Sequence, residues 1–163
     1  MFSVFCSLLI YLIHMVLLTD IKKLRSETGV GVMDARKALE SSSGDISKAR
    51  EWLKRHAVLK AAKKADRQTS EGTIFSYIHQ TAKVAAMVKI GCETDFVAKT
   101  DDFKSLGKEI SMQVCSMNPK DPQELLAQEW IRDPKKTIAD LVNANIAKVG
   151  ENIKILEFVR MEI

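Results

Sequence analysis

Residues 84–117 read VAAMVKIGCETDFVAKTDDFKSLGKEISMQVCSM, and the spacing of their apolar residues changes once along the stretch. Val, Ala, Val and Ile occupy alternate positions up to Ile90, which is typical of a strand with one buried face. From Asp101 apolar residues recur at helical spacing, and Asn118-Pro119 forms a stop signal. We therefore predict a strand, a polar junction and a helix that covers the resulting sheet.

The segments on either side of this stretch are a second strand and a connection. Ile74, Ser76 and Ile78 occupy alternate positions, and residues 80–82 are short enough for a hairpin turn between antiparallel strands. Residues 119–136 contain all three prolines of the chain. We expect them to form a connection with a short apolar piece inside it.

A second helix and a third strand complete this half of the chain. Thr137 and Asp140 have the spacing of a capping box, an apolar helical stripe follows them, and Gly150 supplies a stop. Alternation after Gly150 predicts a strand whose alternate positions hold Ile153, Ile155, Val159, Met161 and Ile163. Residues 72–163 are thus expected to fold as ββααβ, with helices packed on a small antiparallel three-stranded sheet.

The N-terminal third of the chain predicts three short helices with a common core. Their expected ranges are 19–26, 33–42 and 45–58. Gly44 stands where a left-handed helix cap is needed, and Asp45 can accept hydrogen bonds from the first backbone N–H groups of the third helix. A bundle of about 40 residues is close to the lower size limit for independent folding without a metal or disulfides. The whole chain is therefore expected to belong to the α+β class.

A basic, alanine-rich stretch joins the two regions. Residues 54–67 carry six Lys and Arg side chains and no Gly or Pro, so we interpret residues 59–71 as a solvated helical linker. The alternative is a phosphate-binding stripe, and an RNA-binding protein that used it would lose affinity steeply as salt rises. We favour the linker because no aromatic residues for base stacking are interleaved with the cations.

Residues 1–18 form an almost wholly apolar leader, which has three interpretations. Seventeen helical residues span roughly 26 Å, just short of a typical hydrocarbon core, so a membrane anchor is one alternative. A secretory signal is disfavoured because no Lys or Arg precedes the apolar run and no small-residue cleavage site follows it. We favour the third, in which translation starts at Met15 and residues 1–14 come from an overextended reading frame, because Thr19-Asp20 is a helix start.

Composition and motifs argue against an enzyme. The net charge of +4 is concentrated in residues 1–68, which carry 13 basic against 7 acidic side chains. Cys6, Cys92 and Cys115 form no C-x-x-C pair, and no histidine cluster has metal-ligand spacing. No pattern typical of a nucleophilic triad, a dinucleotide fold or a P-loop is present. We expect a reduced, cytoplasmic protein without a metal or cofactor.

The polar junction between strand and helix, residues 91–99, contains two apolar residues that need an explanation. On pattern alone, Phe96 and Val97 are interpreted as core residues that tuck beneath the following helix. The alternative is that an aromatic side chain at a loop tip inserts into a pocket of a partner, because buried aromatic anchors dominate interface energetics. The pattern does not decide between the two.

Three stretches of the chain resemble elongation factor Ts, and they lie within residues 19–163. They are residues 21–39, with IKKLR and TGVGVMDARKAL; residues 60–65 leading to 92–99, with KAAKKA and CETDFVAK; and residues 146–153, with IAKVGENI. The first is similar to the ubiquitin-associated-like N-terminal domain of that family. The resemblance implies such a domain at residues 19–58 and the family's core at residues 72–163.

The resemblance also implies a function without covalent chemistry. A family member is a guanine nucleotide exchange factor that binds elongation factor Tu with GDP and speeds GDP release, so that GTP can bind during elongation. In the family, the Asp-Phe pair of the signature approaches the nucleotide site of the partner near its magnesium ion, which carries over to Asp95 and Phe96. The rest of the implied partner-binding set is Thr94, Val97, Ala98 and Lys99, with Arg25, Val32 and Met33 in the N-terminal domain.

The chain departs from many family members in the length of its core. The stretch between Met117 and Thr137 is short, whereas many relatives have a second subdomain there. Short relatives work as homodimers, so the resemblance implies a homodimer. Residues 158–161 contain no cysteine for an intersubunit disulfide, so the dimer would be noncovalent at that point.

Three other functions stay open at this point. A ubiquitin-binding adaptor would use the three-helix region, although the second domain argues against it. An RNA-binding protein would use residues 54–67, and a membrane-tethered exchange factor would need the leader.

Overall fold

The computed structural model describes residues 17–163, which divide into two compact units. One unit ends at Ala57 and the other runs from Val58 to Ile163, and each has its own hydrophobic core. Residues 1–16, which hold most of the leader and the alternative start at Met15, lie outside the described residues. No helix within residues 17–163 is long and apolar enough to cross a membrane.

The first unit is built from three helices, as the sequence predicts. They are α2 (Leu18–Thr28), α3 (Val32–Ser41) and the greater part of α4 (Ile46–Ala62). Gly44 has a left-handed φ of 82°, and Asp45 Oδ1 accepts hydrogen bonds from the backbone N–H groups two and three residues later, at 2.8 and 3.1 Å. Both predicted caps are therefore confirmed. The buried side chains of this unit are Ile21, Leu24, Ala35, Ala38, Leu39, Ala49 and Leu53.

The basic stretch after the third helix is only partly helical. The prediction of a helical linker over residues 59–71 is wrong beyond Ala62, where the chain turns and then extends. Asn152 Nδ2 donates to the carbonyl oxygens of Ala65 and Arg67 at 3.3 and 2.9 Å, so these two carbonyls do not need helical partners. The turn that follows α4 is therefore bound by a residue distant in the sequence, which local composition does not reveal.

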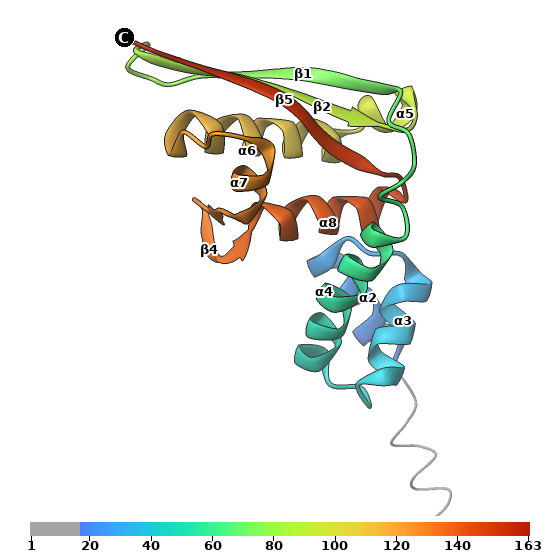
Figure 1. Ribbon diagram of the computed structural model, residues 1–163. Coiled ribbons are helices and arrows are strands. Elements are labelled where there is room, and N and C mark those ends of the chain that lie inside the picture. The colour runs from blue at the N-terminus through green and yellow to red at the C-terminus, as the bar shows by residue number, and fades with distance from the viewer. Residues whose placement is uncertain (1–16) are drawn as a thin grey trace, which may run out of the picture. The chain divides into compact units, whose positions relative to one another are not determined.

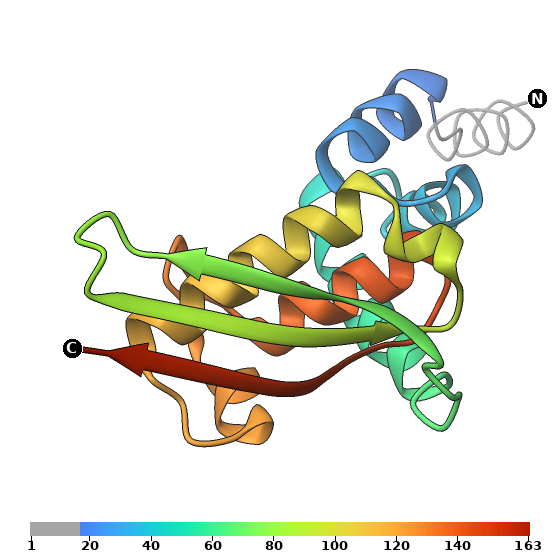
Figure 2. The same ribbon diagram turned by 90° about the horizontal axis from the view of Figure 1, so that it is seen from above.

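The second unit places helices on one face of a three-stranded antiparallel sheet (Figure 1). The strands are β1 (Glu71–Ile78), β2 (Val84–Cys92) and β5 (Ile153–Glu162), and Figure 2 shows β2 between the other two. α6 (Asp101–Met117) and α8 (Ile138–Val149) lie on the same side of this sheet (Figure 1). Fully buried apolar side chains between these elements include Val88, Ile90, Phe103, Ile110, Val114 and Ile138. The predicted α+β class and three-stranded sheet are confirmed.

The connection between α6 and α8 has more structure than the sequence predicts. It contains α7 (Pro122–Ala127) and a two-stranded antiparallel sheet of β3 (Glu129–Trp130) and β4 (Asp133–Thr137). Gln113 of α6 is fully buried, and its side-chain amide makes hydrogen bonds of 3.0 Å with two backbone groups of this hairpin. A buried amide with both polar atoms paired holds the hairpin against α6.

A β-bulge reverses the faces of β5 halfway along the strand. The register against β2 shifts at Leu156, which has no opposing residue. Ile153 is buried and Ile155 packs against the core, but Val159 and Met161 are exposed. The predicted alternation is therefore wrong for the second half of the strand, because one extra residue moves every later side chain to the other face. The residues that point toward the helices after the bulge are Phe158 and Arg160.

The face of the sheet opposite the helices carries several exposed apolar side chains. Five of them are between 42% and 67% exposed: Ile74, Ile78, Met87, Val159 and Met161. Three exposed polar residues, Ser76, Lys89 and Glu157, lie on the same face, because Ser76 is paired with Met87 and Lys89 is paired with Ile74 and Glu157. Met87 and Val159 are directly opposite each other across β2 and β5. The two β1 isoleucines of the predicted alternation lie on this face, while the aromatic residues between them pack against the core. We call the five apolar side chains the open-face patch.

Candidate functional site

The signature segment forms one helical turn, α5 (Asp95–Ala98), at the end of β2 (Figure 1). Thr94 is its N-cap, and the hydroxyl oxygen of Thr94 accepts a hydrogen bond from Val97 N at 3.5 Å. Thr100 caps α6 in the same way, accepting from Phe103 N at 3.3 Å. A single helical turn is not stable alone in water, because fixing its residues costs more than its few hydrogen bonds contribute. The position of α5 therefore depends on its neighbours.

Phe96 and Val97 leave α5 in different directions. Val97 is 8% exposed and belongs to the core, whereas Phe96 is 79% exposed. The interpretation of both as core residues is therefore confirmed for Val97 and wrong for Phe96. Ala98 is half-buried and Lys99 is exposed.

An ion pair lies on the exposed side of α5. Lys99 Nζ donates to Asp95 Oδ2 at 2.6 Å, four residues apart on the helix. This hydrogen bond is the main cause that lowers the pKa of Asp95, and the carboxylate in turn raises the pKa of Lys99. The turn thus presents a carboxylate, an ammonium group and a phenyl ring to solvent.

Two junctions that are distant in the sequence are joined next to α5. Glu151, in the turn between α8 and β5, accepts hydrogen bonds from the Thr94 N–H at 3.0 Å and from the Thr94 hydroxyl at 2.7 Å. In the opposite direction, Glu93 Oε1 accepts from the Asn152 N–H at 2.6 Å. We call these four residues, Glu93, Thr94, Glu151 and Asn152, the polar clamp.

The basic stretch after α4 also contacts the polar clamp. Arg67 Nη1 lies 3.4 Å from Glu93 Oε1, and Lys64 Nζ donates to the carbonyl oxygen of Gly150 at 2.6 Å. Arg67 and Lys64, two cations of the alternative phosphate-binding stripe, therefore bind groups of the protein itself. Two of the three stretches that resemble the family meet here: residues 60–65 with 92–99, and residues 146–153.

Sequence reasoning did not single out Glu93, Glu151 or Asn152. Their partners lie 57 to 59 residues away for the bonds between the two junctions, so no local spacing indicates them. The one signal in the sequence was their place inside the stretches that resemble the family.

The other predicted contact residues belong to the first unit, at the turn between α2 and α3. Arg25 Nε donates to the carbonyl oxygen of Val30 at 3.4 Å. Val32 and Met33 begin α3, and they are 49% and 61% exposed. This unit therefore presents a cation and two apolar side chains at one turn.

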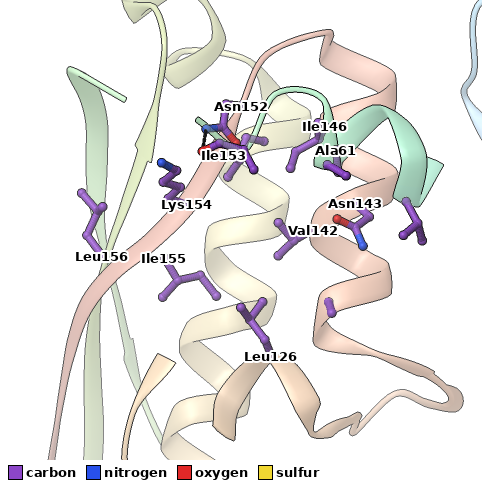
Figure 3. A pocket seen from close by; sticks show the side chains of 14 residues that line it. Ala61, Leu126, Val142, Asn143, Ile146, Asn152, Ile153, Lys154, Ile155 and Leu156 are labelled. Atoms are coloured by element: carbon purple, nitrogen blue, oxygen red, sulfur yellow. Dashed lines mark hydrogen bonds between the residues drawn. The ribbon is translucent and has the colours of Figure 1, made fainter. Parts of the chain in front are cut away.

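A hollow of about 510 Å³ lies within the second unit, lined by the end of α4, by α7 and α8, and by the first half of β5. Figure 3 shows Val142, Ile146 and Ile155 along it, and Asn152 with its hydrogen bond at one end. The lining is aliphatic apart from Asn143, Asn152 and Lys154. Within residues 17–163, no group of three or more His, Cys, Asp or Glu side chains is placed to hold a metal ion.

Comparison with known proteins places this arrangement in a family. The family model described as elongation factor TS matches residues 93–163, which include α5 and the whole polar clamp. A protein of Petrotoga mobilis named elongation factor Ts is 39% identical over 88% of this chain and 95% of its own length. Proteins of the same name from Thermoanaerobacter pseudethanolicus and Nitratidesulfovibrio vulgaris are 40% and 39% identical, over 87% and 88% of this chain and 92% and 94% of their own lengths.

These alignments run over 187 or 188 positions, although this chain has 163 residues, so the relatives contain residues that it lacks. The similarity nevertheless covers most of this chain and most of the relative, well beyond the part that the family model matches. The chain therefore belongs to the elongation factor Ts family of translation elongation factors.

Proposed function

We propose that this protein is a guanine nucleotide exchange factor for elongation factor Tu. It binds elongation factor Tu with GDP and speeds GDP release, so that GTP can bind. The observation that carries the proposal is Phe96, which is 79% exposed on a turn whose other apolar residue, Val97, is anchored in the core. Membership of the elongation factor Ts family supports the identity of the partner.

The proposed mechanism requires no covalent step. The phenyl ring of Phe96 and the carboxylate of Asp95 enter the nucleotide site of the partner and weaken the magnesium and phosphate contacts that hold GDP. Thr94, Val97, Ala98 and Lys99 hold these two residues in place. By linkage, bound nucleotide weakens the affinity for the exchange factor by the same factor, so the complex is transient.

The two units have different parts in this proposal. Residues 19–58 form a ubiquitin-associated-like domain that contacts the partner through Arg25, Val32 and Met33, whose exposure supports the assignment. Residues 59–71 are a linker, and residues 72–163 are the exchange core.

We also propose that the protein works as a homodimer. The open-face patch consists of five aliphatic side chains on a face of the sheet that no described helix covers. Large contiguous apolar patches on soluble proteins are typical of interaction sites. Two such sheets stacked face to face form a sandwich with a buried apolar layer. The shorter length of this chain against its relatives supports an assembly that supplies the missing surface.

Release of fluorescently labelled GDP from elongation factor Tu tests the exchange function. We expect the wild type to accelerate release and Phe96→Ala or Asp95→Ala to reduce the acceleration by about tenfold or more, as loss of an interface anchor does. Met117→Ala is the control, because Met117 is a half-exposed apolar residue at the far end of α6. No acceleration by the wild type would overturn the proposal, and full activity of Phe96→Ala would remove Phe96 from it.

A further inference from the structure

We propose that Glu151 is a positioning residue for nucleotide exchange: it fixes α5 in the orientation that presents Phe96. The inference rests on the exchange function proposed above. Glu151 lies outside α5, and it is 57 residues away from Thr94 in the sequence.

One carboxylate controls both groups that determine how α5 begins. Glu151 Oε2 accepts from the Thr94 backbone N–H at 3.0 Å, which fixes the last peptide group before the turn. Glu151 Oε1 accepts from the Thr94 hydroxyl at 2.7 Å, which fixes the rotamer of the N-cap side chain. The same hydroxyl oxygen accepts from Val97 N within α5. The first turn of the helix is therefore oriented from outside.

The turn needs this further attachment because its own contacts with the core come from two small side chains in its second half, Val97 and Ala98. Val97 is buried, while the neighbouring Phe96 and Lys99 are exposed. Core contacts in the second half of a four-residue turn do not fix the orientation of its N-terminal end. Glu151 attaches the turn at its N-terminal end, and a ring that is held at one angle loses less entropy when it binds.

The position of Glu151 is itself fixed by its neighbours. The Asn152 N–H donates to Glu93 Oε1 at 2.6 Å, and the carbonyl of Gly150 accepts from Lys64 Nζ at 2.6 Å. Asn152 is 3% exposed, so its contacts face little competition from water. The α8–β5 turn is thus a rigid support rather than a free loop.

The experiment measures order and exchange separately. Hydrogen–deuterium exchange of the amides of residues 95–99 is followed in the free protein, and GDP release from elongation factor Tu is followed with the labelled nucleotide. The variants are Glu151→Ala and Glu151→Gln, each in the wild type and in Phe96→Ala. Glu124→Ala is the matched control, because Glu124 also accepts a backbone N–H, that of Lys120 at 3.0 Å, but lies in α7.

We expect Glu151→Ala to speed deuterium uptake at residues 95–99 and to lower exchange efficiency by about tenfold, as when only a tenth of the molecules hold the binding-competent orientation. Glu151→Gln should stay within about threefold of the wild type, because its amide can accept from the Thr94 N–H and donate to the hydroxyl. In the Phe96→Ala background, Glu151→Ala should cost clearly less than tenfold, since only Asp95 is then left for α5 to position. Glu124→Ala should change neither readout.

Three results would overturn the inference: unchanged uptake at residues 95–99, unchanged exchange by Glu151→Ala, or an equal loss in the Phe96→Ala background. If Glu151→Ala does not fold, Glu151→Asp replaces it, because the shorter side chain cannot reach both Thr94 groups and should give the same faster uptake. If the wild type does not speed GDP release from elongation factor Tu, the proposed exchange function is overturned instead. Deuterium uptake at residues 95–99 would still test whether Glu151 supports α5.

Discussion

Phe96 and Val97 are consecutive residues of one helical turn, yet Phe96 is 79% exposed and Val97 is 8% exposed. Consecutive helical residues point about 100° apart, so a turn that lies on a core buries one and exposes the next. The side chain assigned to the partner and the side chain assigned to the fold are therefore separate, and each can be altered without the other.

Truncation of these two residues should affect stability differently. Val97→Ala removes buried methyl groups and should lower the free energy of unfolding by about 1–3 kcal/mol. Phe96→Ala removes a ring that contacts mostly water and should change it by less than about 0.5 kcal/mol. Urea denaturation measures both. A loss of stability for Phe96→Ala as large as that for Val97→Ala would show that the ring belongs to the core.

Lys99→Met should raise the pKa of Asp95 back toward its ordinary value of 3.8, because the hydrogen bond from Lys99 is the main cause of its lowered value. NMR titration of the Asp95 carboxyl measures it. Asp133 is the control, since its pKa is lowered by its own partner, Lys136, and should not move. An unchanged Asp95 titration in Lys99→Met would contradict the ion pair.

The same pair should stabilise α5 only within a window of pH. The pKa of Asp95 is lowered in the folded state, so its contribution is present above the ordinary value of 3.8 and is lost as pH falls through the lowered one. The pKa of Lys99 is raised, so its contribution is present below 10.5 and is lost as pH rises through the raised one. Amide exchange of residues 95–99, compared between the wild type and Lys99→Met, should differ at neutral pH and converge in acid.

Gly107→Ala should destabilise the protein, although alanine favours a helix by about 1 kcal/mol over glycine. A methyl group at Gly107 of α6 would lie 2.2 Å from the Phe75 ring of β1. Overpacking of this kind costs about 1–3 kcal/mol. Thermal or urea unfolding measures it, and Phe75→Leu in the same chain should recover part of the loss. A gain in stability from Gly107→Ala alone would mean that Phe75 and α6 leave more room at this position than the 2.2 Å approach indicates.

Met87→Glu should dissociate the proposed homodimer. Met87 lies on the central strand of the open-face patch, opposite Val159, so a carboxylate there would be buried and would face its copy across the interface. Sedimentation equilibrium should show at least about a tenfold rise in the dissociation constant. Met117→Glu places the same charge on an exposed apolar residue outside the patch and should not change the assembly. A wild type that stays monomeric at micromolar concentration would contradict the dimer.

The sequence by itself determined the elements whose ends depend on near neighbours. The Asp45 cap, the left-handed Gly44 and the capping box of Thr137 and Asp140 were all predicted and are all present. Each of these features satisfies backbone groups within about four residues, so the donor and the acceptor can be read from one short stretch. Alternation along β2 predicted its core face for the same reason, because a strand has a period of two.

Only the tertiary structure decided the features that depend on distant residues. Asn152 binds the turn after α4, the bulge at Leu156 reverses the faces of β5, and Glu151 binds the N-cap residue of α5 from the other junction. The sequence also left Phe96 and Val97 equivalent, because a four-residue turn has too few positions to show a periodic face. Which of the two lies against the core depends on the angle at which β2 and α6 meet the turn, and long-range packing sets that angle.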